Sequence, residues 1–98
     1  MDIFAVTYRY SDDVAARDAH RPEHRAYLSG VEGMLLSGPL ADPDGALLVV
    51  AAPTRESVEE RLAGDPFATE GIVVERTIRP YTPVLGELAA TFAEHLER

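Results

Sequence analysis

Apolar residues recur at two spacings along the chain, and these spacings predict seven elements of secondary structure. Alternating or continuous apolar runs, typical of strands, cover residues 3–10, 34–40, 46–52 and 72–80. Apolar residues three and four positions apart, typical of amphipathic helices, cover residues 12–31, 55–63 and about 83–97. Turn residues at 42–45 join the second and third strands in a hairpin. The predicted order is β-α-β-β-α-β-α.

The first predicted helix contains a proline, Pro22, and we expect the helix to bend or restart there. We expect it to end at Gly33. After Pro22, His24 shares one helix face with apolar side chains at 27, 28 and 31, so the imidazole should face inward. Residues 65–67, Asp-Pro-Phe, are expected to form a loop.

This order of elements is typical of a ferredoxin-like α+β fold, βαββαβ, in which an antiparallel four-stranded sheet carries two crossover helices on one face. The strand at 46–52 is apolar on both sides, so the helix-free face also needs to be covered. We expect a homodimer with sheets face to face, a dimeric α/β barrel, and the C-terminal helix is the other candidate cover. Residues 1–80 would form the domain and residues 81–98 a C-terminal helical extension.

The C-terminal helix is expected to bury one apolar stripe against the barrel edge or a partner chain. The stripe consists of Leu85, Leu88, Phe92 and Leu96. Three acidic side chains on the other faces, Glu87, Glu94 and Glu97, should lie in water.

Charge and composition restrict the function. The chain of 98 residues has a net charge of −8 and no basic run, so we expect no nucleic-acid partner and no anionic membrane partner. Its longest apolar run is too short for a membrane helix, and no secretory signal is visible, so we expect a cytoplasmic protein. The absence of Cys and Lys excludes thiol nucleophiles and Schiff-base lysines, which leaves proton transfer by His and carboxylates.

Three short clusters carry the candidate chemistry. They are Arg21-Pro22-Glu23-His24, Ser37-Gly38-Pro39-Leu40 and Asp65-Pro66-Phe67. With the intervening hairpin, they resemble in order and spacing the successive blocks of the YciI-like (YCII-related) family, over roughly residues 1–80. The resemblance implies a ferredoxin-like fold, dimers of the α/β-barrel type and an active site in which His24 works with Asp65. It also implies lyase-like or isomerase-like reactions on small cyclic or aromatic-derived compounds.

Each candidate residue also has a purely structural interpretation. His24 could be a core histidine, and Asp65 could cap the turn that follows it. Capping and catalysis are compatible, because one carboxylate oxygen can accept a backbone N–H while the other holds the imidazole. Ser37 either contacts substrate or only ends a strand. Arg21 either clamps a substrate anion or forms a surface salt bridge with Asp18 or Glu23.

Two further features are assigned no chemistry. Arg25 stands where an apolar residue is commoner in the family, which should affect packing more than chemistry. Residues 20–24 match the zinc motif H-x-x-E-H, but a helix interrupted at Pro22 would not present both histidines to one metal, and three protein ligands are usual. We therefore expect no metal and no cofactor.

These observations favour a small cofactor-free enzyme of lyase or isomerase type. His24 and Asp65 would transfer protons on a small anionic molecule, with Arg21 and Ser37 as substrate-binding residues. One alternative is a non-catalytic module that binds a small molecule, because the fold does not decide function. A second alternative is a cofactor-free oxygenase.

Overall fold

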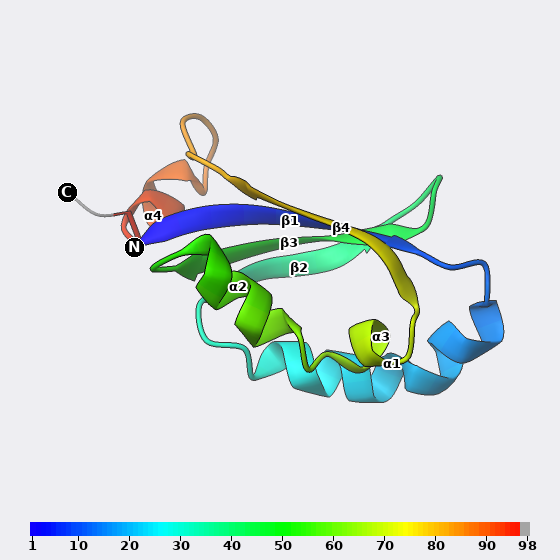
Figure 1. The fold of residues 1–98 in the computed structure, drawn as a ribbon. Coiled ribbons are helices and arrows are strands. Elements are labelled where there is room, and N and C mark those ends of the chain that lie inside the picture. Colours follow the sequence, from blue (N-terminus) through cyan, green and yellow to red (C-terminus); the bar gives the residue numbers. More distant parts are fainter. Residues whose placement is uncertain (97–98) are drawn as a thin grey trace.

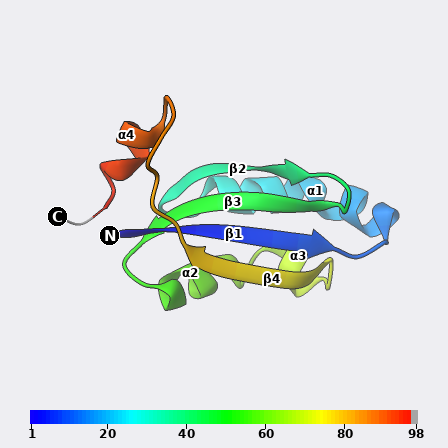
Figure 2. The same ribbon diagram turned by 90° about the horizontal axis from the view of Figure 1, so that it is seen from above.

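A four-stranded antiparallel sheet forms the centre of the computed structural model, which describes residues 1–96 (Figure 1). Its strands are β1 (Asp2–Tyr10), β2 (Met34–Leu40), β3 (Gly45–Ala52) and β4 (Val73–Pro80). They lie in the order β2-β3-β1-β4, with antiparallel pairing between all neighbours (Figure 2). This is the predicted ferredoxin-like α+β arrangement, and the predicted strands are confirmed to within a residue.

Three helices lie on one face of the sheet: α1 (Val14–Ser29), α2 (Arg55–Leu62) and α3 (Pro66–Thr69) (Figure 1). Helix α2 packs against β3 and β4, whereas α1 packs mainly against α3. The core lies between sheet and helices and includes Val6, Leu48, Val50, Leu28, Val58 and Leu62. No helix within residues 1–96 is both long enough and apolar enough to cross a membrane.

Helix α1 runs without interruption past Pro22, so the expected restart is wrong. The side chains of Arg17 and His24 are buried on either side of the proline, and this packing outweighs its poor helix propensity. The helix ends at Ser29 and is capped by Gly30, not by Gly33. Gly33 instead forms the turn into β2 with a φ of 80°.

The expected loop at residues 65–67 is the start of the one-turn helix α3. Asp65 is its N-cap and accepts a hydrogen bond from the backbone N–H of Phe67. Pro66 occupies the first turn, where a missing N–H costs no intrahelical bond. The motif Asp-Pro-Phe therefore encodes a helix start, with an extended backbone at Asp65 as expected before proline.

The expected helix over residues 83–97 is also wrong in its extent. Helix α4 spans only Ala89–Ala93 and lies with its flanking segment on the face opposite α1 (Figure 1). Gly86, with a φ of 114°, breaks the helix before it can begin at Pro83. Leu85 is 91% exposed and Leu88 is exposed as well, so the stripe is not buried within this chain. Glu87 and Glu94 are exposed as expected, and Glu97 lies outside the described residues.

Candidate active site

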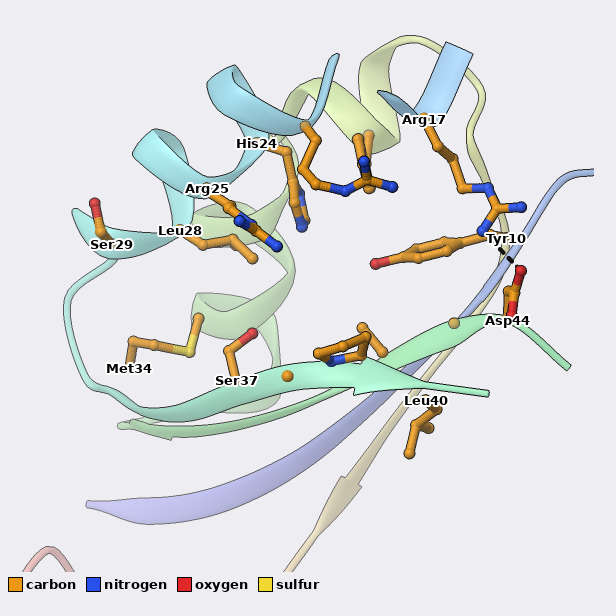
Figure 3. A pocket seen from close by; sticks show the side chains of 16 residues that line it. Tyr10, Arg17, His24, Arg25, Leu28, Ser29, Met34, Ser37, Leu40 and Asp44 are labelled. Carbon is orange, nitrogen blue, oxygen red and sulfur yellow. Dashed lines mark hydrogen bonds and ion pairs between the residues drawn. The ribbon is translucent and has the colours of Figure 1, made fainter. Parts of the chain in front are cut away.

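A cavity of about 540 Å³ opens between α1 and the β2 edge of the sheet (Figure 3). It is lined by residues of α1, β2 and the β2–β3 turn, together with Tyr10 at the end of β1 and Phe67 of α3. The cavity exists because α1 packs on α3 and stands off the β2–β3 half of the sheet. A space of this size accommodates a molecule of one or two rings.

His24 lines the inner wall of this cavity, and Asp65, a second predicted site residue, lies buried behind it. The imidazole Nδ1 lies 2.8 Å from Oδ1 of Asp65. Asp65 is fully buried and His24 is 8% exposed, so the pair is shielded from bulk water. The ring of His24 points into the cavity (Figure 3).

Helix α3 fixes the carboxylate of Asp65. The same oxygen, Oδ1, accepts hydrogen bonds from His24 Nδ1 and from the backbone N–H of Phe67. We expected the two partners to use different oxygens, and this detail is wrong. Oδ2 is buried and has no hydrogen-bond partner among residues 1–96.

Phe67 supports the imidazole from its face. The rings of His24 and Phe67 stack with centroids 3.8 Å apart and planes 7° apart. The edge of Phe67 in turn meets Tyr10, with ring centroids 5.3 Å apart. His24 is therefore held at Nδ1 by a carboxylate and at its ring face by an aromatic side chain.

This arrangement sets the chemistry open to His24. An ionised carboxylate can only accept hydrogen bonds, so the hydrogen of a neutral imidazole is held on Nδ1. Nε2 then carries a free lone pair and is the nitrogen available to take a proton from a molecule in the cavity. Asp65 would stabilise the imidazolium that results.

Ser37 and Arg21 also line the cavity, as predicted for substrate-binding residues. Ser37 lies on β2 across from α1, and its hydroxyl points into the cavity (Figure 3). Arg21 forms an ion pair with Asp18 at 2.7 Å, the surface salt bridge given as its structural interpretation. Arg21 also borders the cavity, so its role in binding a substrate anion stays a prediction.

Tyr10 and Arg17 are cavity residues that the sequence did not single out. The phenol of Tyr10 points into the cavity (Figure 3). Burial, followed by the charge of Asp65, raises the pKa of Tyr10 to about 12, so its hydroxyl stays protonated near neutral pH. Arg17 lies over the Tyr10 ring and pairs with Asp44 at 2.9 Å.

Arg25 also lines the cavity, whereas we expected it to affect only packing. Its side chain extends from α1 into the cavity on the same side as His24 (Figure 3). The signal in the sequence was the spacing of Arg17, Arg21 and Arg25, four residues apart on one helix.

The H-x-x-E-H residues are not assembled around one point. His24 is bonded to Asp65, whereas His20 lies near Glu23 and Glu70 at 3.7 and 3.8 Å. The helix is continuous, so our argument from an interruption at Pro22 does not hold. Within the described part of the chain, no group of three or more His, Asp or Glu side chains could hold a metal ion.

The fold and site define a ferredoxin-like α+β protein with a buried His–Asp pair beside a cavity. A model of the YCII-related domain matches residues 1–82, and the chain therefore belongs to the YCII-related family. The resemblance in its three sequence blocks is thus confirmed. A search of curated protein sequences finds no match.

One solved structure with the same fold comes from Burkholderia phenoliruptrix AC1100. It is 5-chloro-2-hydroxyhydroquinone dehydrochlorinase (TftG) in complex with 2,5-dihydroxybenzoquinone. The TM-score is 0.72 with 19% sequence identity, and the match covers 81% of this chain and 92% of that chain. At this identity the likeness supports the common fold.

Proposed function

We propose that this protein is a cofactor-free enzyme of lyase or isomerase type that moves protons on a small anionic, ring-containing molecule. The observation that carries the proposal is the contact of 2.8 Å between His24 Nδ1 and Asp65 Oδ1 beside a cavity of about 540 Å³. A buried carboxylate that orients an imidazole toward a cavity is the arrangement expected of a general base.

In the proposed reaction, His24 Nε2 removes a proton from a tetrahedral carbon next to a carbonyl group, as in the keto tautomer of a hydroquinone or hydroxyquinone. The C–H electron pair moves into the ring and builds negative charge on the carbonyl oxygen. Hydroxyl groups of Tyr10 and Ser37 point into the cavity and would donate hydrogen bonds to that oxygen (Figure 3). The carbanion then either expels a leaving group, as in a lyase, or takes the proton back at another carbon, as in an isomerase.

The structural neighbour gives this chemistry a concrete example. Its name describes removal of hydrogen chloride from a chlorinated hydroxyhydroquinone, and its structure contains 2,5-dihydroxybenzoquinone. We propose hydroxylated quinones and hydroquinones as the first substrates to test. The apolar and aromatic side chains of Leu28, Met34 and Phe67 would contact such a ring.

The test follows proton transfer directly. Wild-type protein is incubated with 2,5-dihydroxybenzoquinone in D₂O, and exchange of the ring protons is measured by NMR. Chloride release from 5-chloro-2-hydroxyhydroquinone is measured in parallel. We expect acceleration by the wild type, and a loss of roughly 100-fold or more in His24→Ala and Asp65→Asn. The matched control is His20→Ala, because His20 lies on the same helix and does not line the cavity.

A fully active His24→Ala variant would overturn the proposal. Binding of the quinone by the wild type without proton exchange or elimination would favour the non-catalytic binding module. Consumption of dissolved oxygen with the hydroquinone would favour the oxygenase.

We further propose that two copies of the chain pair through the sheet faces opposite α1, α2 and α3. Leu36 and Leu40 on this face are 50% and 43% exposed, and the side chain of Leu40 points away from the cavity (Figure 3). Exposed leucines on one sheet face favour association with another apolar surface. Leu36→Glu should therefore shift sedimentation toward monomer, whereas Val14→Glu, at an exposed position of α1, should not.

A further inference from the structure

Three arginines of α1 line the cavity, and two of them are already neutralised. Arg17 is paired with Asp44 at 2.9 Å, and Arg21 with Asp18 at 2.7 Å. The side chain of Arg25 has no hydrogen bond or ion pair with any residue between 1 and 96. We propose that Arg25 binds the anionic group of the substrate and sets the preference of this site for anions. This inference rests on the proposed function, since it concerns the same cavity.

The neighbours of Arg25 on the helix give it no internal partner. One turn before and after it stand Arg21 and Ser29, and neither carries a negative charge. Arg21 is itself paired with Asp18, so that carboxylate is not available to Arg25. Among the described residues, the guanidinium of Arg25 therefore lines the cavity without a carboxylate partner.

The unpaired charge in the cavity is opposite in sign to the net charge of the chain. The chain has a net charge of −8, yet the cavity lining holds three arginines and only one carboxylate, Asp44. Asp44 is paired with Arg17, Asp18 with Arg21, and the buried Asp65 with His24, so the unpaired positive charge lies on Arg25. The guanidinium of Arg25 would thus attract a small anion at this point of the cavity, although the chain carries a net negative charge.

The position of Arg25 also defines the ligand class. Arg25 follows His24 directly, and both side chains point into the cavity (Figure 3). A guanidinium binds a carboxylate through two parallel N–H groups, or a phenolate oxygen through converging N–H groups, and either contact fixes the charged end of a ring. The structure therefore favours a planar aromatic or quinonoid anion whose charged group lies on Arg25 and whose reacting carbon faces His24.

The experiment compares a charged and a neutral probe of equal size, benzoate and benzamide, by isothermal titration calorimetry. Wild type should bind benzoate more tightly than benzamide. Arg25→Met should weaken benzoate binding at least about tenfold and leave benzamide binding within twofold. Arg25→Lys should restore part of the benzoate affinity. The matched control is Arg76→Met, which removes the same charge from an exposed position of β4 outside the cavity and should leave both affinities unchanged.

The inference is overturned if wild type does not prefer benzoate, if Arg25→Met leaves benzoate affinity intact, or if both probes weaken equally. Circular dichroism checks that each variant is folded. Calorimetry measures binding and does not depend on turnover, so its result can be judged separately from the proton-exchange test of the proposed function. A protein that shows Arg25-dependent benzoate binding but no proton transfer would refute the enzyme while supporting the anion site.

Discussion

The ring of Phe67 lies parallel to the imidazole of His24, with the two centroids 3.8 Å apart, while the backbone N–H of Phe67 binds the carboxylate that holds His24. One residue thus supports both members of the proposed catalytic pair. This relationship explains why aspartate, proline and phenylalanine occur together at 65–67. Asp65 starts the helical turn, Pro66 fits its first position, and Phe67 places an aromatic face on the imidazole.

Replacing Phe67 with leucine should therefore impair activity as well as stability. The side chain is 2% exposed, so Phe67→Leu should lower the free energy of unfolding by about 1–3 kcal/mol, measured by urea denaturation. Without the stacked ring the imidazole can rotate, and proton exchange with the quinone should slow in the folded variant. Phe92→Leu makes the same change at a half-buried position of α4 and should leave the exchange rate unchanged. Equal exchange rates in the two variants would contradict a positioning role for Phe67.

Two substitutions at Asp65 should separate its capping role from its charge. The amide oxygen of Asp65→Asn can still accept from Phe67 N–H and from His24 Nδ1–H, so its free energy of unfolding should stay within about 1 kcal/mol of wild type. Asp65→Ala loses the cap and leaves His24 Nδ1 unpaired, at a cost of about 1–3 kcal/mol. Both variants should lose activity, since neither stabilises an imidazolium. An active Asp65→Asn would show that only the orientation of His24 matters.

The sequence pattern of helix α1 predicted part of the site and missed the rest. The spacing of apolar residues after Pro22 correctly placed His24 on the inward face of α1, and the interpretation of Asp65 as a cap is confirmed by its hydrogen bond from Phe67 N–H. The same spacing could not show that α1 stands off the β2 edge and leaves a cavity, because that separation depends on packing between α1 and α3. Arg25 and Tyr10 were missed for this reason.

In the C-terminal segment, the sequence pattern predicted more helix than the structure contains. Leu85, Leu88 and Phe92 have helical spacing, but such spacing shows only that a helix is compatible with the sequence. The backbone at Gly86 adopts a φ of 114°, which a helix cannot contain. The segment after this glycine is too short for a long helix to form, because a helix is costly to start and gains stability only with length.

Alkaline pH should destabilise the protein through its buried tyrosines. Burial, and after it the charge of Asp65, raises the pKa of Tyr8 above its ordinary value, and the pKa of Tyr10 is raised to about 12. Above about pH 10 the unfolded chain loses phenolic protons that the folded chain retains, so the folded state binds more protons and its stability falls as pH rises. The chain has no lysine, so tyrosines dominate this range. The urea midpoint should be lower at pH 11 than at pH 9.

Tyr8→Phe provides the control for this pH effect. The hydroxyl of Tyr8 is buried without a hydrogen-bond partner in the described part of the chain. Its removal should leave stability at pH 7 unchanged or up to about 1 kcal/mol higher, and should reduce the loss between pH 9 and pH 11. An unaltered pH dependence in Tyr8→Phe would assign the alkaline loss to other groups.

Removal of residues 84–98 should weaken self-association more than it weakens the fold. Leu85 is 91% exposed and Leu88 is exposed as well, so this chain alone gains little from burying either side chain. Full burial of a leucine against a partner contributes roughly 1.5–3 kcal/mol, and each 1.4 kcal/mol is about a tenfold change in a dissociation constant. We therefore expect the truncated chain to dissociate at a concentration at least about tenfold higher in sedimentation experiments. The double variant Leu85→Ser/Leu88→Ser, which keeps the segment, should reproduce this shift with little change in the urea midpoint. An unchanged dissociation constant in both proteins would exclude these leucines from the interface.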